Sequence, residues 1–324
     1  TYTGNVLLRL ALEPTAATGR TDAAWKDLPN AKSPSASYAL LVHLFQARGL
    51  PAADANGLID PFVAVTCSGV GLKSSTKVKT RDPMYYETLV FDINIPTVCV
   101  YSIYLTVQCM YERTHQPRIG FQVYDWDRWA KDDFVGGATI SLQDVTIIAS
   151  SDYTAGYAVP KPTWYNLSYE EGKGGEGQLL VSCTLVAKDF PDQVIDPPTS
   201  IKPKMQEKFL EIICLGLRDL SPIGFMPLHM PFLQFDIGEV SSSNRPKKTG
   251  GSSKPTPANP NFLERILIPI QLPEDAQFAP RLNLSVFDTL LGGFHKPLLG
   301  TCSIDLTTKL PFSNGVENPV YVAP

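Results

Sequence analysis

The sequence predicts an all-β chain that contains two antiparallel β-sandwiches in tandem. Three observations predict this fold: turn residues are dense, apolar residues alternate in short runs, and one pattern of residues occurs twice. The 324 residues include 28 prolines and 23 glycines, and few stretches have a helical period. Short alternating runs between such turn residues are typical of a sandwich. The chain is long enough to bury two hydrophobic cores.

Strands are expected where apolar residues alternate with others, since successive side chains of a strand point to opposite faces. Four such stretches lie within residues 40–44, 63–65, 121–123 and 180–184. Turn residues follow or separate them, at 51–57, 82–83, 136–137 and 172–177. These boundaries predict short strands that are joined by loops.

An internal repeat indicates that the same sandwich is present twice. The pattern Leu40-x-Val42-x-Leu44 returns as Leu210-x-Ile212-x-Cys214 later in the chain. Two further pairs follow in the same order and at nearly the same spacing: residues 123–125 match 286–288, and residues 136–142 match 300–306. Repeats that keep order and spacing predict two copies of one structural unit.

The repeat predicts the domain organisation. The first sandwich is expected at residues 38–190 and the second at residues 205–324, with a proline-rich linker at 191–204 between them. Residues 1–37 stand outside both copies, as an N-terminal strand and linker. Residues 241–260 are poor in apolar residues and are expected to form a long mobile loop inside the second copy.

The composition excludes several classes of protein. The net charge of −4 argues against a chain that binds nucleic acid by bulk electrostatics, and no run is apolar enough to span a bilayer. Six cysteines occur without metal-ligand spacing, which favours free thiols in a reducing compartment. The sequence has no G-x-S-x-G, phosphate-loop or H-E-x-x-H motif, so no enzyme is expected. It starts at Thr1 without a signal-like segment, which indicates a piece of a longer protein.

Acidic residues of the first copy gather in two loops. Asp54 and Asp60 flank one loop, and Asp125, Asp127 and Asp133 lie in a second loop about 65 residues later. At one end of a sandwich these carboxylates would repel one another unless a cation compensates. Calcium suits such a site, because it takes ~6–8 oxygen ligands in loose geometry. A solvated pair of turns is the alternative explanation.

These five aspartates resemble the calcium ligands of C2 domains of the synaptotagmin and protein kinase C kind, which place aspartates at the same spacing in their first and third loops. The resemblance implies carbonyl ligands near Ala53, Trp126 and Lys131. The second copy departs from it, since its corresponding positions hold Gly224, Met230, Leu290 and Pro297, and only Asp288 is kept. The second copy is therefore expected to lack a calcium site.

From about residue 38 to residue 312, the chain resembles the ferlin family. The resemblance is carried by residues 45–54, 201–203, 210–213, 259–262, 272–274 and 293–300. Ferlins are large tail-anchored proteins with many C2 domains that act in membrane fusion and repair. The resemblance implies two tandem C2 domains from the C-terminal half of such a protein, at the cytoplasmic face of a membrane.

Two further features suit a membrane. Lys73, Lys77 and Lys79 cluster where C2 domains carry a basic strand that binds phosphoinositides, although an ordinary solvated edge strand also uses lysine. Trp126 and Trp129 flank the third-loop carboxylates, and an indole suits the bilayer interface. The leading hypothesis is a module that binds anionic phospholipid when calcium is present, with protein partners for the second domain and no nucleic acid.

Two alternatives stay open at this stage. The domains could be the regulatory part of a lipid-modifying or signalling enzyme, whose catalytic motifs would lie outside this sequence. They could also form a scaffold that binds proteins without calcium. A calcium titration separates the scaffold from the leading hypothesis.

Overall fold

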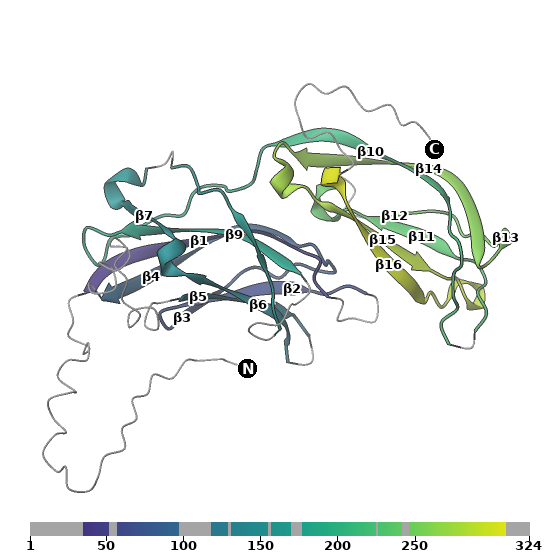
Figure 1. The fold of residues 1–324 in the computed structure, drawn as a ribbon, viewed down its shortest axis with the longest axis horizontal. Coiled ribbons are helices and arrows are strands. Elements are labelled where there is room, and N and C mark those ends of the chain that lie inside the picture. Colours follow the sequence, from purple (N-terminus) through teal and green to yellow (C-terminus); the bar gives the residue numbers. More distant parts are fainter. Residues whose placement is uncertain are drawn as a thin grey trace, which may run out of the picture.

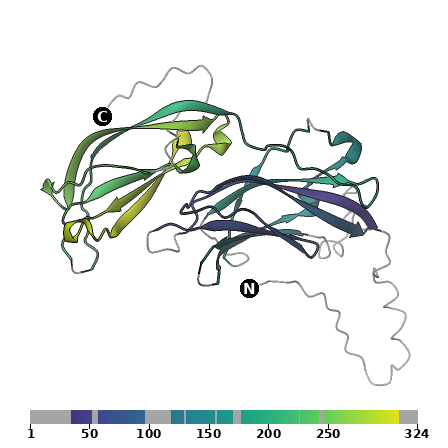
Figure 2. The ribbon, with the colours of Figure 1, turned by 180° about the vertical axis from the view of Figure 1, so that it is seen from behind.

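The computed structural model describes residues 35–51, 57–96, 118–128, 131–154, 157–169, 177–224, 226–241 and 246–308. They form two β-sandwiches that lie side by side along the long axis of the molecule, the first in purple to teal and the second in green to yellow (Figures 1 and 2). The described helical elements are single 3-10 turns, so the predicted fold class, two C2-type β-sandwiches in tandem, is confirmed.

Two sheets face each other in the first domain. One sheet has the order β4-β1-β9-β7, and β8 also pairs with β9; the other has the order β3-β2-β5-β6. The strands are β1 (Ser35–Arg48), β2 (Pro61–Cys67), β3 (Val70–Lys73), β4 (Met84–Pro96), β5 (Arg118–Asp125), β6 (Asp133–Ser141), β7 (Thr146–Ala149), β8 (Thr163–Asn166) and β9 (Gln178–Ala187). Among the described strands, β7 and β9 form the one parallel pair.

The second domain repeats this plan with fewer strands. Its sheets have the orders β10-β14-β13 and β12-β11-β15-β16. The strands are β10 (Met205–Gly216), β11 (Phe232–Asp236), β12 (Lys247–Lys248), β13 (Pro255–Thr256), β14 (Asn259–Pro273), β15 (Arg281–Phe287) and β16 (Leu298–Asp305). The 3-10 turns of the chain are η1 (Leu142–Asp144), η2 (Ser150–Asp152), η3 (Gly238–Val240), η4 (Ala276–Phe278), η5 (Leu291–Gly293) and η6 (Leu306–Thr308).

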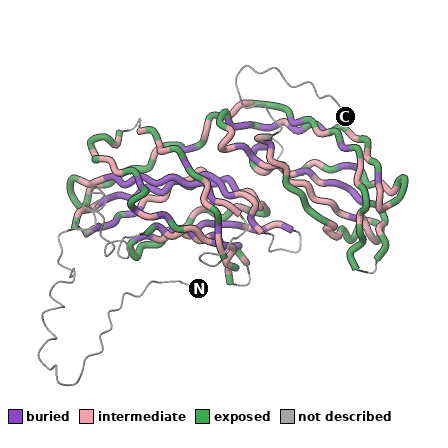
Figure 3. The backbone as a smooth tube through the Cα atoms, in the orientation of Figure 1, coloured by how far each residue is buried: buried purple, intermediate pink, exposed green. Residues whose placement is uncertain are grey.

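Strand β1 is buried on both faces, which its alternating pattern does not indicate. Leu40, Val42 and Leu44 face the core between the sheets, as their spacing predicts. The residues between them are buried as well, because Leu41 packs against Ile195 from the segment that follows β9. The outer face of this sheet is therefore covered, and Figure 3 shows the strand as a nearly continuous purple tube.

The proline-rich segment at residues 191–204 packs onto the first domain. Ile195 lies against Leu41, and Ile201 lies in a second cluster with Phe45 and Leu180. The Tyr153 hydroxyl also donates to the carbonyl of Asp196 at 2.8 Å. Apolar anchors and a hydrogen bond to the backbone therefore hold this linker along the sheet.

Part of the stretch expected to be a long loop, residues 241–260, is built into the second sandwich. It contains β12, β13 and the start of β14. Thr249 is buried, its N–H donates to the carbonyl of Leu233 at 2.9 Å, and its hydroxyl accepts from the N–H of Leu233 at 3.0 Å. The contacts that hold this stretch in the sandwich are made by backbone and hydroxyl groups instead of apolar side chains. The apolar content of the stretch therefore predicts a loop although part of it forms strands.

The N-terminal strand expected within residues 1–37 lies outside the described residues, apart from the start of β1. Cys67, Cys183, Cys214 and Cys302 are free thiols. No helix in the described part of the chain is both long and apolar enough to cross a membrane.

Candidate functional site

Three of the predicted aspartates meet at one end of the sheet formed by β2, β5 and β6. Asp60 directly precedes β2, Asp125 ends β5 and Asp133 begins β6. The strand register pairs Pro61 with Asp125, and Asp125 with Asp133. Directly opposed residues of antiparallel strands lie ~5 Å apart at their Cα atoms. The fold therefore brings together backbone positions that are far apart in the sequence.

Hydrogen bonds tie the first and third loops to each other, and they tie the first loop to the segment between β3 and β4. The N–H of Asp60 donates to Oδ1 of Asp125 at 2.7 Å, and the N–H of Lys79 donates to Oδ1 of Asp60 at 2.6 Å. The N–H of Trp126 donates back to the carbonyl of Asp60 at 3.0 Å. Asp125 is only 5% exposed, so its carboxylate is part of the loop framework.

The rest of the third loop is more open to solvent. Asp127 is half-buried, and its N–H lies 3.5 Å from Oδ1 of Asp132. Lys131 and Asp133 are exposed, and the Trp126 side chain is 45% exposed. Asp132 belongs to the same acidic loop of the sequence, but it is not one of the five aspartates that match the C2 ligand pattern.

The remaining predicted ligands lie outside the described residues, namely Asp54 and the carbonyl of Ala53, as does Trp129. Within the described part of the chain, no three histidine, cysteine or acidic side chains are grouped closely enough to hold a metal ion. The donor chemistry at this end is nevertheless that of a site for a hard cation, because Asp60, Asp125, Asp127 and Asp133 offer only oxygen atoms.

The second domain uses its one corresponding aspartate as a structural acceptor. Asp288 is 1% exposed and accepts three backbone N–H groups, from His229 at 2.9 Å, Met230 at 2.7 Å and Thr289 at 2.8 Å. Its own N–H donates to the carbonyl of Pro297 at 3.1 Å. These contacts occupy both oxygens of the Asp288 carboxylate. The loop positions that correspond to the other four aspartates of the first domain hold no carboxylate.

The comparisons with known proteins agree with this geometry. A family model described as "C2 domain" matches residues 38–159. The chain is 25% identical over 284 residues to myoferlin of Xenopus tropicalis and 26% identical over 285 residues to human myoferlin, with 83% of this chain covered in both cases. Fer-1-like protein 4 of Mus musculus is 24% identical over 290 residues, which covers 80% of this chain.

The chain is therefore similar to ferlins over most of its length. It spans 12–13% of the length of these relatives. Among solved structures, a single C2 domain of plant extended synaptotagmin 1 matches with a TM-score of 0.35 at 20% identity, covering 47% of this chain and 96% of that chain. Two consecutive C2 domains of extended synaptotagmin 2 match with a TM-score of 0.34 at 15% identity, covering 95% and 88%. The similarity to ferlins rests on the sequence relatives.

The lysines of the first domain do not form the expected basic strand. Lys73 belongs to β3, and its Nζ lies 4.6 Å from the ring centre of Phe62. Beyond it the chain bulges, because Ser74 and Lys77, three residues apart, donate to Val63 and Pro61, two residues apart.

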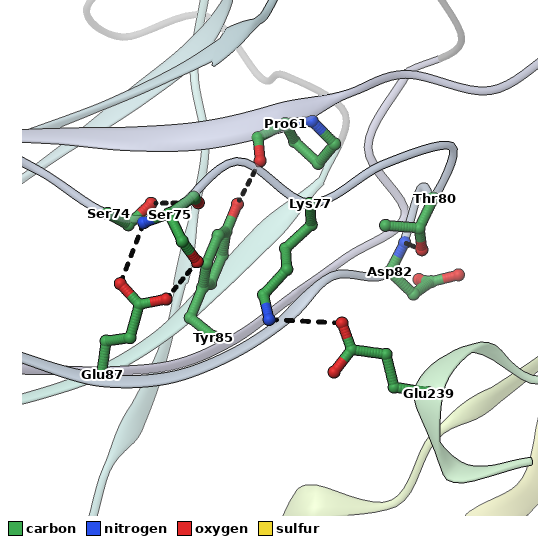
Figure 4. Close-up of polar contacts among 9 residues, drawn as sticks. All are labelled: Pro61, Ser74, Ser75, Lys77, Thr80, Asp82, Tyr85, Glu87 and Glu239. Atoms are coloured by element: carbon green, nitrogen blue, oxygen red, sulfur yellow. Dashed lines mark hydrogen bonds and ion pairs between the residues drawn. The ribbon is translucent and has the colours of Figure 1, made fainter. Parts of the chain in front are cut away.

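Lys77 and Lys79 lie between β3 and β4. Lys79 has a φ of 54°, which an extended strand does not allow, and so Lys77 and Lys79 do not alternate along one strand face. Lys77 forms an ion pair with Glu239 of the second domain at 3.2 Å (Figure 4). Its charge therefore faces the domain interface.

The two domains share an interface that the sequence did not predict. The rings of Phe45 and Phe278 lie 5.4 Å apart, and Nε2 of Gln46 donates to the carbonyl of Phe278 at 3.0 Å. Gly57, at the end of the first loop, has a φ of 77°, and a Cβ there would lie only 2.7 Å from the Leu298 side chain. The described end of the first loop therefore lies directly against the second domain.

Proposed function

We propose that this ferlin-like segment binds anionic phospholipid membranes in a calcium-dependent manner, through the first and third loops of its first domain. The observation that carries the proposal is the strand register, which places Asp60, Asp125 and Asp133 at one end of a sheet. Asp54 and Asp127 complete the five-aspartate pattern in the sequence.

The negative charge of the aspartates at this end would make calcium binding favourable. Five carboxylates close together repel one another and repel an anionic lipid surface. Bound calcium supplies the opposite charge and coordination positions that phosphate oxygens can share. Trp126, half-exposed in the same loop, then offers an amphipathic ring to the headgroup region, and Trp129 is proposed to do the same.

The second domain is proposed to act without calcium. Asp288 is buried and its carboxylate already accepts three backbone N–H groups, so it is not expected to bind a cation. Its role is then to hold the first domain in position and to contact protein partners. We infer no enzymatic activity for either domain. We place the pair at the cytoplasmic face of membranes, in vesicle fusion, trafficking or repair.

Vesicle co-sedimentation of the whole chain tests the proposal. Binding to phosphatidylserine vesicles is expected with calcium and not with a chelator, and Asp127→Asn should remove most of the calcium-dependent part. Asp192→Asn is the matched control, because Asp192 lies exposed in the linker and loses the same charge. Equal binding with and without calcium, or to purely neutral vesicles, would refute the proposal.

A further inference from the structure

A polar cavity of about 450 Å³ lies between the two domains. The first domain contributes Arg48 and Arg81, from the end of β1 and from the approach to β4, and the second contributes Arg281 from the start of β15. Two carboxylates, Asp82 and Asp305, line the same space. The formal charge of this set is therefore positive by one unit.

The two first-domain arginines are held by their Nε atoms. Nε of Arg48 donates to Oε1 of Gln178 at 2.7 Å, and its guanidinium stacks 4.0 Å from the ring centre of Trp164. Nε of Arg81 donates to the carbonyl of Leu50 at 2.5 Å. These contacts orient both guanidinium groups, which line the cavity.

Arg281 crosses the interface and lacks one hydrogen bond. Its Nη1 lies close to Gly49, where a Cβ would come within 3.1 Å of it. Its Nε is buried and has no hydrogen-bond partner in the described part of the chain. A buried donor without a partner is costly, and so this position would gain from an acceptor in the cavity.

The carboxylates in the cavity already have donors. Asp82 accepts the N–H of Gly49 at 2.8 Å and the side-chain amide of Asn283. Asp305 accepts the N–H of Thr307 at 2.9 Å and its hydroxyl at 2.6 Å. Despite partial burial, these bonds and the charges of Arg48 and Arg281 hold the pKa of Asp305 below its usual value. The carboxylates are therefore engaged by groups of the protein itself.

Arg48 and Arg281 also repel each other across the interface. Burial, and secondly the charge of Arg281, lower the pKa of Arg48. An anion between them would relieve this repulsion and accept from the terminal nitrogens. Guanidinium groups bind phosphate in a bidentate manner, and three of them from different elements suit a tetrahedral group with several oxygens.

We propose that this cavity binds a phosphate-bearing anion, either a soluble phosphate ester or the headgroup of a phospholipid. Binding there is proposed to be independent of calcium, because the loop aspartates in the described part of the chain, Asp60, Asp125, Asp127 and Asp133, do not line the cavity. A ligand held by Arg48, Arg81 and Arg281 together contacts both domains, and it would therefore fix their relative orientation.

Calorimetric titration of the whole chain with inorganic pyrophosphate, in the presence of a calcium chelator, tests the site. Saturable binding at one site is expected. Arg281→Gln and Arg81→Gln should each weaken it by about tenfold or more, since each removes charge-assisted hydrogen bonds. Arg265→Gln is the control, because Arg265 is exposed and pairs with Glu211 at the surface of the second domain.

A second arm separates the two sources of phosphate. Phosphatidylcholine vesicles with and without phosphatidylinositol bisphosphate are offered to the same variants under the chelator. Binding to the phosphoinositide vesicles that is lost in Arg281→Gln and Arg81→Gln assigns the site to a lipid headgroup, whereas binding of pyrophosphate alone assigns it to a soluble ester.

Two results would overturn the proposal. One is that neither pyrophosphate nor the phosphoinositide vesicles bind at millimolar concentration of the probe. The other is that the wild-type chain and the variants Arg281→Gln, Arg81→Gln and Arg265→Gln all bind equally well. Because Arg281→Gln removes a group at the interface, melting curves of the unliganded variants are compared first. Arg281→Lys keeps the charge without the bidentate fork and should bind with intermediate affinity. If either Arg281 variant fails to fold, Arg81→Gln decides the test.

Discussion

The N–H of Met230 donates to Asp288 at 2.7 Å, and the N–H of Asp60 donates to Asp125 at the same distance in the first domain. Met230 and Asp60 occupy corresponding places in the repeat, as do the two acceptors. In both domains this bond ties the first loop to the end of a central strand. The aspartate therefore has a structural task apart from any cation, which explains why it alone is kept in the second domain.

Asp288→Asn should lower the free energy of unfolding of the chain by about 1–3 kcal/mol. The amide keeps one acceptor oxygen, but it replaces the other with a donor that faces a backbone N–H, and a buried donor is then left unsatisfied. Urea unfolding measures the change. Asp192→Asn, which removes an exposed charge in the linker, should leave the midpoint nearly unchanged. Equal midpoints for both variants would contradict the structural role.

Calcium should raise the melting temperature of the whole chain, because a ligand that binds only the native state stabilises it. Asp60→Asn and Asp127→Asn should each abolish most of this rise, since each removes a charge from the proposed ligand set. Asp288→Asn serves as the opposite control: it should lower the melting temperature while the rise with calcium persists. A melting curve that does not move at millimolar calcium would show that the first domain lacks the site.

Acid should destabilise the chain through His43. His43 is fully buried, and burial lowers its pKa from 6.5 to about 4. The unfolded chain therefore binds a proton between these values that the folded chain excludes, so stability falls as the pH drops below 6.5. Each unit of pKa shift is worth about 1.4 kcal/mol, and the loss approaches about 3 kcal/mol near pH 4.

Comparison with His43→Gln isolates this contribution. The glutamine can keep a hydrogen bond to Thr88, which lies 2.9 Å from Nδ1 of His43, and it does not titrate. Urea midpoints of both proteins are compared at pH 7 and pH 4.5. The wild-type chain should lose more stability than the variant over this interval, and parallel losses would mean that His43 is not responsible.

Phe278→Ala should loosen the domain interface without unfolding either sandwich. Phe278 packs on Phe45, and its carbonyl accepts from Gln46, so truncation removes the ring contact and leaves the backbone contact. The loss is expected to be about 2 kcal/mol, and calorimetry should then resolve two transitions where the wild type has one. Lys77→Ala is the milder comparison, because a partly exposed ion pair with Glu239 contributes little.

Residue types and strand order were enough to predict that three of the loop aspartates lie at one end of a sheet. Asp60, Asp125 and Asp133 follow or precede apolar strand patterns, and antiparallel pairing of those strands brings them together. The sequence could not indicate that the Asp125 carboxylate accepts a backbone N–H, because any residue other than proline at position 60 would supply that donor. Nor could it predict the bulge near Lys77, which is followed by a positive φ at Lys79.

The domain interface was beyond sequence reasoning for a related reason. Arg48, Arg81 and Arg281 are far apart in the chain, and each alone is typical of a solvated surface. Similarly, the sequence indicates that Phe45 points outward from a strand and that Ile201 belongs to the linker. Both are buried only because the linker and the second domain pack against the first domain. Periodicity describes single elements well, whereas burial between domains depends on contacts that no local pattern contains.

Trp126→Ala should weaken vesicle binding while it leaves the calcium response in solution unchanged. The indole is half-exposed next to Asp125, and transfer of such a ring into the headgroup region contributes on the order of 1–3 kcal/mol, or about tenfold in affinity. Trp129→Ala is expected to act in the same way. Asp127→Asn should instead damage both the calcium response and vesicle binding, since the ring can approach an anionic surface only after the loop charge is compensated.

Fluorescence identifies the responsible ring. A blue shift is expected only when calcium and phosphatidylserine vesicles are present together, and it should shrink in Trp126→Phe and in Trp129→Phe. Phe294→Ala is the control for a general loss of apolar surface, because Phe294 is 95% exposed in the second domain. If Phe294→Ala weakens vesicle binding as much as Trp126→Ala, or if the blue shift persists when both tryptophans are replaced, the first domain does not insert through this loop.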